Sequence, residues 1–563
     1  MPKTPSIIDA TSDRYVADYA RLHPIDATLI GITDHDDALT DFSPEGHQAR
    51  ADLTATALRD IDAAEATTDA QRAAKAVFVE REQIYLELHQ AGLFQADLNV
   101  IESPPQQVRM VFDLMGTETA AEWELIAKRL IKVPDALANL RASLAASAAQ
   151  GRISAIRQVS KVIEQCETWS GQRGGSSFFA DLVAGADNVD GVDNALRTDL
   201  RAGASAASSA YADLAHFLRA ELAPKAPAKD AVGIDVYRLW SRYFTGSALD
   251  LTEAYQWGWE EFFRVEAEMK QVADRIKPGA TLAEAAAMLD ADPRYRVHGN
   301  DGLQAWMQRL SDQALDELRG VHFDIPDPLM KLECRIAPPG GGVGAYYTGP
   351  ADDFSRPGRM WWSVPADRTE YSTWRETSTV YHEGVPGHHL QIATAVYQAD
   401  TLNRFQRLMS GTSGYCDGWA LYAERLMREL GYLGDDGDLM GMLDAHLFRA
   451  ARVIVDIGMH LELEIPAGSG FHPGERWTPD LGLEFMLTRT ITDPHHVHDE
   501  IDRYLGWPGQ APSYKLGERL WLAARDEAKQ RAGAAFDLKA FHQQALEMGS
   551  MGLDTMRERL AEL

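Results

Sequence analysis

The chain has 563 residues, of which 45% are hydrophobic and 25% charged, and its formal net charge at pH 7 is −29. Single hydrophobic cores stop growing at roughly 250–300 residues, so the length predicts two lobes or a large multilayered helical body. The composition excludes a disordered chain. The acidic balance also argues against a nucleic-acid partner, which needs a basic face to displace counterions.

The N-terminal stretch "MPKTPSIIDATSDRYV" has one early lysine and no apolar core, so we expect no signal peptide. No uninterrupted apolar stretch approaches the roughly 20 residues of a membrane helix, and we expect no membrane partner. Cys166, Cys334 and Cys416 form an odd, sparse set that fits a reducing compartment better than a disulfide framework. The sequence therefore predicts a cytoplasmic protein.

Most of the chain is alanine-rich, with apolar residues recurring at steps of three and four. This pattern predicts amphipathic helices. The clearest segments are 69–90, 119–150, 195–222, 251–276 and 303–319. The expected fold class is mainly α.

The pattern changes once, at "KLECRIAPPGGGVGAYYTGPADDFSRPGRMWWSVPADR" (331–368). Its Tyr, Trp, Val and Ile residues, interrupted by Pro and Gly, predict two or three short strands. The run "GGGVG" (340–344) is interpreted as a flexible connection, since no Gly-Lys-Ser/Thr follows it. We place a mainly helical part at 1–330 and a second part at 331–563, which together form one continuous cleft.

The segment "YHEGVPGHHLQ" (381–391) begins as the helix of a zinc hydrolase does, with a histidine followed by a glutamate. The usual second histidine would stand at 386, where Pro386 is found. In a regular helix His388 would lie about 9 Å along the axis from His382, and His389 about 10.5 Å. Neither histidine could then share a metal with His382.

Pro386 and Gly387 indicate how His388 can come close to His382 despite the two extra residues. A proline ring clashes with the carbonyl four residues earlier and cannot donate to it, and glycine leaves helical geometry at little cost. "VPG" therefore predicts a bulge that holds two extra residues and returns His388 to the place of the usual second ligand. Use of His389 instead is the alternative.

A carboxylate on a following helix commonly completes such a site, and "GTSGYCDGWALYAERL" (411–426) supplies two. Asp417 and Glu424 are seven residues apart, so they lie on one helical face about two turns apart. Only one of them can be the third ligand, and the other would orient the ligands.

These residues carry a resemblance. "HEGVPGHHLQ", "DGWALYAERL", "VDIGMH", "PGQAPSYKLG" and "HPIDATLIGITDHDDALTDFSPEG" (23–46) resemble the DUF-885 family, bacterial proteins of largely unassigned function with zinc-metallopeptidase-like character. The resemblance implies a fold similar to the carboxypeptidase Taq family and gluzincin-like proteins. Such a fold is a two-lobed helical body with a deep cleft and a small sheet beside the zinc-binding helices.

The same resemblance favours Asp417 as the third ligand, with Glu424 at the family's second acidic position. The DUF-885 pattern usually has glutamate at the first position, so Asp417 is a departure. "GQAPSYKLG" (509–517) resembles a segment near the Taq active site and makes Tyr514 the expected donor to the tetrahedral oxyanion. "RVIVDIGMH" (452–460) loosely resembles another segment, in which His460 would assist Tyr514 or orient a ligand.

The chemistry expected is a zinc-dependent hydrolysis of short peptides, carboxypeptidase-like, with one zinc ion held by His382, His388 and Asp417. Zinc would polarise the scissile carbonyl and activate water, with Glu383 as general base. Tyr346, Tyr347 and Arg356 are expected to bind substrate, Arg356 through a carboxylate. Two alternatives stay open: a metal-dependent amidase acting on a non-peptide metabolite, and an inactive helical binding protein.

Overall fold

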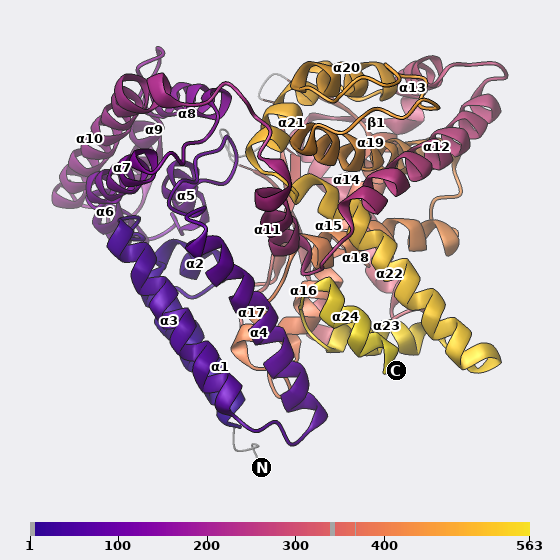
Figure 1. The fold of residues 1–563 in the computed structure, drawn as a ribbon, viewed down its shortest axis with the longest axis horizontal. Coiled ribbons are helices and arrows are strands. Elements are labelled where there is room, and N and C mark those ends of the chain that lie inside the picture. The colour runs from indigo at the N-terminus through magenta and orange to yellow at the C-terminus, as the bar shows by residue number, and fades with distance from the viewer. Residues whose placement is uncertain (1–5, 338–343, 366–367, 563) are drawn as a thin grey trace.

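The computed structural model describes residues 6–337, 344–365 and 368–562 (Figure 1). Its first third forms a helical body that stands beside the rest of the chain and is drawn in indigo to magenta. The helices of this N-terminal body are α1 (Ile7–Leu22), α2 (Pro24–Leu29), α3 (Pro44–Ala63), α4 (Asp69–Gln90), α5 (Pro104–Met110), α6 (Ala120–Leu130), α7 (Val133–Ala149), α8 (Ile156–Trp169), α9 (Phe178–Ala184) and α10 (Asn194–Phe217).

The remaining helices make up the rest of the molecule together with the short strands. They are α11 (Gly233–Thr245), α12 (Leu251–Ile276), α13 (Leu282–Ala291), α14 (Gly299–Leu318), α15 (Thr373–Glu383), α16 (His388–Tyr397), α17 (Arg404–Leu408), α18 (Ser413–Glu429), α19 (Asp436–Leu461), α20 (Pro479–Arg489), α21 (Pro494–Gly506), α22 (Gln510–Ala532), α23 (Leu538–Glu547) and α24 (Leu553–Ala561). A mainly helical fold with a small sheet is thus confirmed.

The helix prediction for 119–150 divides into α6 and α7. Pro134 stands at the start of α7, where its missing N–H costs nothing, whereas within a continuous helix it would remove a hydrogen bond and clash. The other four helical segments appear close to their expected ranges as α4, α10, α12 and α14.

Two large hydrophobic cores divide the chain at a different place from the boundary expected near residue 330. The smaller core draws its buried residues from 25–222 and lies within the N-terminal body. The larger one joins α12 and α14 to the C-terminal helices, and it also takes residues from α1, α3 and α4. The segment from α11 to α14 therefore packs with the C-terminal part, and the N-terminal helices pack against both cores.

Three strands confirm the prediction for 331–368: β2 (Leu332–Ile336), β3 (Gly344–Thr348) and β4 (Gly358–Ser363). They form a sheet of order β2-β4-β3, in which β2 and β4 are parallel and β3 and β4 antiparallel. A separate antiparallel pair joins β1 (Arg296–His298) to β5 (Glu370–Ser372), directly before α15. Most of the "GGGVG" run lies outside the described residues, so the interpretation of 340–343 as a connection stays a prediction.

Two helix crossings fix the core around the site. At Gly441 of α19 an added Cβ would lie 1.8 Å from the Trp374 carbonyl of α15. At Gly418 of α18 it would lie 2.6 Å from Gly517 of α22. Side chains at these glycines would push the helices apart, so the glycines allow α15, α18, α19 and α22 to approach closely.

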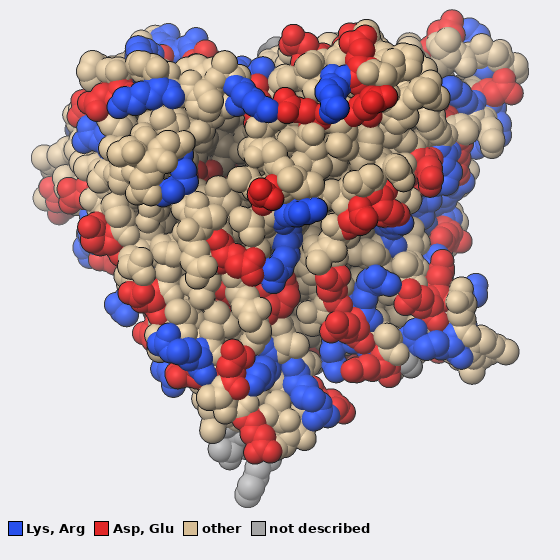
Figure 2. All heavy atoms as spheres, viewed as in Figure 1, with Lys and Arg blue, Asp and Glu red and all other residues tan. Residues whose placement is uncertain are grey.

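The surface carries acidic and basic side chains interspersed on the face drawn in Figure 2, which is hollowed near α5, between the N-terminal body and the rest. Among the described residues, none of the helices combines the length and apolar character needed to cross a membrane.

Candidate metal centre

The bulge predicted at "VPG" is the turn that separates α15 from α16. Helix α15 ends at Glu383 and α16 begins at His388. The Gly387 N–H donates to the Tyr381 carbonyl at 3.1 Å, and the His389 N–H donates to the Gly384 carbonyl at 3.1 Å. An added Cβ at Gly387 would lie 1.9 Å from the His382 carbonyl, so the close return of the chain requires glycine.

This turn brings the first two expected ligands together. The ring centroids of His382 and His388 lie 4.8 Å apart at an angle of 88°. A regular helix would have separated them by about 9 Å along its axis. The Trp419 indole of α18 donates to the Pro386 carbonyl at 2.8 Å and ties the turn to the helix that carries the acidic residues.

Asp417 stands opposite both histidines. Its Oδ1 lies 3.4 Å from His388 Nε2 and 3.9 Å from His382 Nε2. Ligand atoms about 2.1 Å from a tetrahedral ion are separated by about 3.4 Å, so the distances from Asp417 to the two histidines are close to those between zinc ligands. Burial disfavours the charged carboxylate, but the facing histidines hold the pKa of Asp417 well below its usual range.

Glu424 contacts the other side of the first histidine. His382 Nδ1 donates to Glu424 Oε1 at 2.8 Å, which leaves Nε2 facing Asp417. Burial lowers the pKa of the His382 ring, but its contacts with Asp417 and Glu424 outweigh burial and raise the pKa to about 9. Glu424 therefore orients His382 and fixes the ring nitrogen it presents, as the partner of a metal ligand does.

A second buried layer supports Glu424, and sequence reasoning missed it. His446 of α19 places Nε2 3.6 Å from Glu424 Oε2, and its Nδ1 accepts a hydrogen bond from Lys515 Nζ at 2.9 Å. The ammonium has no lone pair, so the His446 proton sits on Nε2 and faces the carboxylate. Burial and the Lys515 charge lower the pKa of His446 to about 4, so the ring is neutral.

His389 has a different environment. Its Nε2 donates to the Leu329 carbonyl at 2.7 Å and its Nδ1 accepts from the Tyr347 hydroxyl at 2.9 Å. Burial lowers the pKa of this ring to about 4. Both nitrogens of the neutral ring are occupied, so the geometry does not support His389 as an alternative ligand.

Glu383 is the remaining expected participant. Its carboxylate, His382 and His388 together offer three possible ligand atoms that lie within 4.8 Å of one another. Glu383 is buried, and its Oε2 has no hydrogen-bond partner within the described chain. Burying an unpaired carboxylate oxygen costs free energy, and a catalytic role is one explanation for such a group. The geometry is compatible with Asp417 as the third ligand expected from the sequence, because its Oδ1 faces Nε2 of both histidines. The expected role of Glu383 as general base stays a prediction.

Tyr514 lies one helical turn before Gly517, where α22 crosses α18 beside Asp417. Burial and the Asp417 charge raise the pKa of its phenol, so the hydroxyl keeps its proton at neutral pH. The Arg452 guanidinium carbon lies 5.0 Å from the centre of the Tyr514 ring. The expected hydrogen-bond donor is therefore near the acidic ligand and keeps the proton it would donate.

The expectation for His460 is corrected. His460 is fully buried and its Nε2 contacts the Tyr504 carbonyl at 2.9 Å. It follows Arg452 on α19 by eight residues, about 12 Å along the helix axis. The ring packs against Tyr237 and holds α21 in place, so its role is structural.

The three residues expected to bind substrate lie on or beside the sheet. Tyr346 is 38% exposed on β3, an outer strand of the sheet, and stacks on Trp361. Tyr347 contacts His389, as described above. Arg356 is half-buried in the β3–β4 connection, and the one hydrogen bond of its side chain in the described chain is a 3.5 Å contact with the Pro357 carbonyl. Their contact with substrate stays a prediction.

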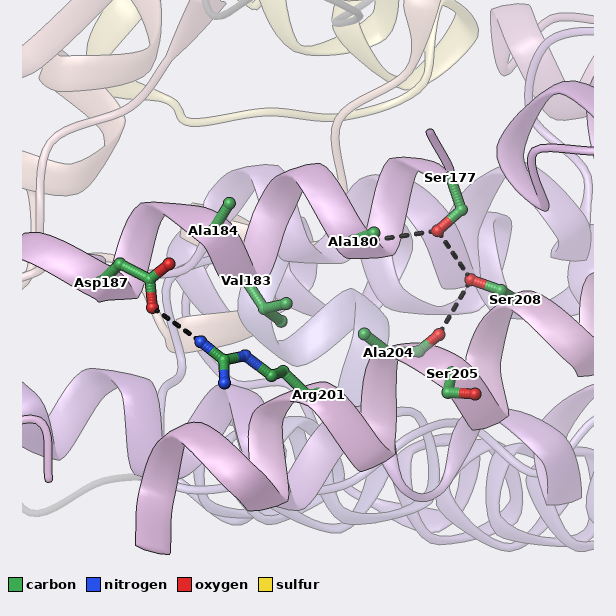
Figure 3. Close-up of a pocket in the computed structure, with 9 residues that line it drawn as sticks. All are labelled: Ser177, Ala180, Val183, Ala184, Asp187, Arg201, Ala204, Ser205 and Ser208. Atoms are coloured by element: carbon green, nitrogen blue, oxygen red, sulfur yellow. Dashed lines mark hydrogen bonds and ion pairs between the residues drawn. The ribbon is translucent and has the colours of Figure 1, made fainter. Parts of the chain in front are cut away.

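A separate pocket lies within the N-terminal body, between α9 and α10 (Figure 3). Its lining is mostly alanine and serine. Arg201 pairs with Asp187 at 3.3 Å, and Ser208 donates to the Ser177 hydroxyl at 2.8 Å. These contacts pair four of its polar side chains with one another, and none of its residues is among His382, His388 and Asp417.

Comparison with known proteins identifies the family of this chain. The family model described as "Bacterial protein of unknown function (DUF885)" matches residues 24–560. The chain belongs to DUF885. This DUF885 member has no significant match among curated proteins.

Two solved structures share the fold of this DUF885 chain. The putative lipoprotein from Colwellia psychrerythraea has a TM-score of 0.85 and 23% identity, over 99% of this chain and 98% of that one. A putative lipoprotein of unknown function from Shewanella oneidensis has a TM-score of 0.73 and 18% identity, over 99% of this chain and all of that one.

Proposed function

We propose that this DUF885 protein is a metal-dependent hydrolase that cleaves short peptides, with zinc held by His382, His388 and Asp417. The observation that carries the proposal is the return of the chain at Gly387, which sets two histidines and one carboxylate at ligand spacing. When bound, zinc supplies Lewis acidity to a substrate carbonyl and to water. The carboxypeptidase Taq-like architecture inferred from the sequence is part of this proposal.

The protein's own groups have distinct tasks. Glu383 accepts a proton from the attacking water and passes it to the leaving amine. Tyr514 donates a hydrogen bond to the oxygen on which charge develops. Glu424 holds His382 with Nε2 toward the ligand cluster, and His446, which is held by Lys515, lies 3.6 Å from the second oxygen of Glu424. These supports are buried, so they fix the ligand geometry before any substrate arrives.

The experiment is metal analysis of purified protein together with hydrolysis of a peptide panel. We expect close to one zinc per chain, loss of activity on chelation, and recovery on adding zinc. Glu383→Gln should keep the zinc and lose at least about 100-fold in kcat, as the removal of a general base does. Protein that neither carries zinc nor takes it up would refute the proposal in favour of a binding protein.

A zinc-loaded protein that ignores every peptide but hydrolyses acylated metabolites would identify the amidase alternative. The chemistry of Glu383 and Tyr514 would be the same, and only the groups that contact substrate would differ.

The compartment is a separate proposal. We propose a cytoplasmic location because the three cysteines are free. The structural neighbours are described as putative lipoproteins, which points the other way. Fractionation of cells that produce the natural full-length protein tests the proposal, and recovery with the membrane or periplasm would contradict it.

A further inference from the structure

A stripe of polar side chains follows one face of α19 past the candidate metal centre. It consists of His446, Arg449, Arg452, Asp456 and His460, at steps of three or four residues. Four of the five have clear hydrogen-bond partners: His446 accepts from Lys515, Arg452 donates to Glu500, Asp456 accepts from Tyr237, and His460 contacts the Tyr504 carbonyl. Arg449 is the exception.

The Arg449 guanidinium has no hydrogen bond and no carboxylate within 4.0 Å among the residues described. Its Nε is sealed from solvent although the residue is only half-buried, so its exposed surface lies elsewhere on the side chain. An unsatisfied buried donor costs about 1–3 kcal/mol, and more when it is charged. Such groups persist where a ligand completes them.

Arg449 lies next to the proposed reaction centre. Its guanidinium carbon is 5.9 Å from the centre of the Tyr514 ring, and its charge helps to keep Glu424 ionised. Arg452 lies on the same ring, but it pairs with Glu500, a carboxylate that also pairs with Arg503. Arg449 is thus the guanidinium beside Tyr514 on α19 that has no carboxylate in ion-pair contact within the described chain.

We propose that Arg449 binds the C-terminal carboxylate of the substrate and thereby selects peptides with a free carboxylate next to the bond that is cut. The proposal rests on the proposed function. A planar guanidinium matches a carboxylate with two parallel hydrogen bonds. In a peptide the last scissile carbonyl and the terminal carboxyl carbon are roughly 3–4 Å apart. A guanidinium beside Tyr514 therefore meets the carboxylate of the last residue, and Arg356 is not needed for this contact.

The test uses a mixture of N-acetylated dipeptides of varied side chains, each present as the free acid and as the C-terminal amide. Mass spectrometry measures hydrolysis by the zinc-loaded wild-type protein, Arg449→Gln, Arg449→Lys and Arg356→Gln. Arg519→Gln is the matched control, because it removes an exposed guanidinium of α22 that pairs with Glu253. Zinc content and the melting temperature of every variant verify that it is folded and loaded.

We expect wild type and Arg519→Gln to prefer the acids about 10- to 100-fold, the worth of one charge-assisted contact. Arg449→Gln should lose this preference through slower cleavage of acids, with amide cleavage unchanged, and Arg449→Lys should retain part of it. An unchanged preference in Arg449→Gln would overturn the proposal, as would its loss in Arg356→Gln alone.

A binding measurement separates this proposal from the proposed function. The same mixture is passed over immobilised, zinc-loaded Glu383→Gln protein with and without the Arg449→Gln change. Selective retention of acids that requires Arg449, without hydrolysis by the wild type, would support carboxylate binding by Arg449 and refute the proposed peptidase. Absence of acid preference in both hydrolysis and retention would overturn carboxylate binding by Arg449.

Discussion

Replacing the two acids of α18 one at a time should affect zinc binding by different amounts, because they stand in different relations to His382. Asp417 Oδ1 faces Nε2 of both histidines, whereas Glu424 Oε1 accepts a hydrogen bond from Nδ1 of His382. The acids are seven residues apart, about 10.5 Å along the helix axis, so neither can replace the other. Asp417→Ala removes a ligand, and Glu424→Ala removes the group that orients one.

The sizes of the two effects follow from this geometry. Protein zinc sites with four ligands are worth about 10–16 kcal/mol, or about 2.5–4 kcal/mol for each ligand. Asp417→Ala should therefore weaken zinc binding roughly 100- to 1,000-fold. Glu424→Ala should weaken it about 10- to 100-fold. Glu424→Gln keeps an oxygen that can accept from His382 and should lose less.

Competition titration with a chromophoric zinc chelator measures all variants on one scale. Asp417→Glu should retain or strengthen binding, because it supplies a longer carboxylate at a position that is 15% exposed and so has room for it. Full retention of zinc by Asp417→Ala, combined with its loss in Glu424→Ala, would refute the reasoning and make Glu424 the ligand.

Three further predictions concern the turn and the stripe on α19. His388→Ala should abolish zinc binding measured by equilibrium dialysis, whereas His389→Ala should retain zinc binding and lower Tm. The reverse result in dialysis would identify His389 as the ligand. Gly387→Ala should lower both zinc content and Tm, because its Cβ would lie 1.9 Å from the His382 carbonyl, whereas Gly302→Ala, which meets no atom within 4 Å, should leave both close to wild type. Burial raises the pKa of Asp456 to about 7, from about 4 in an unfolded chain, so its stabilising contribution is full below about pH 4 and is lost as the pH rises through 7. At high pH this ionisation lowers the free energy of unfolding by up to about 4 kcal/mol, and Asp456→Asn removes that loss. The Tm of the variant relative to wild type should therefore rise between pH 5 and pH 8, with zinc content unchanged. Parallel pH profiles of Tm for the two proteins would contradict the assignment.

The sequence by itself determined the local features of this protein. Apolar periodicity located the helices, and Tyr, Trp and Gly marked the strands before α15, because these signals are written in neighbouring residues. Pro386 and Gly387 gave the turn after Glu383 for the same reason: a missing donor and a missing Cβ have consequences within one helical turn.

Only the tertiary structure decided which distant groups meet. No spacing in the sequence relates His446 and Lys515 to Glu424, because three helices must pack before their side chains come within contact distance. In the sequence, His389 and His460 are candidate ligands of the same chemical type as His388. Only the folded chain shows that Nε2 of each ring contacts a backbone carbonyl, that of Leu329 for His389 and that of Tyr504 for His460. Arg449 was indistinguishable from Arg452 until packing gave one of them Glu500 and left the other without a carboxylate. Burial and pairing are properties of the folded chain, so the charge that remains unpaired can be recognised only after folding.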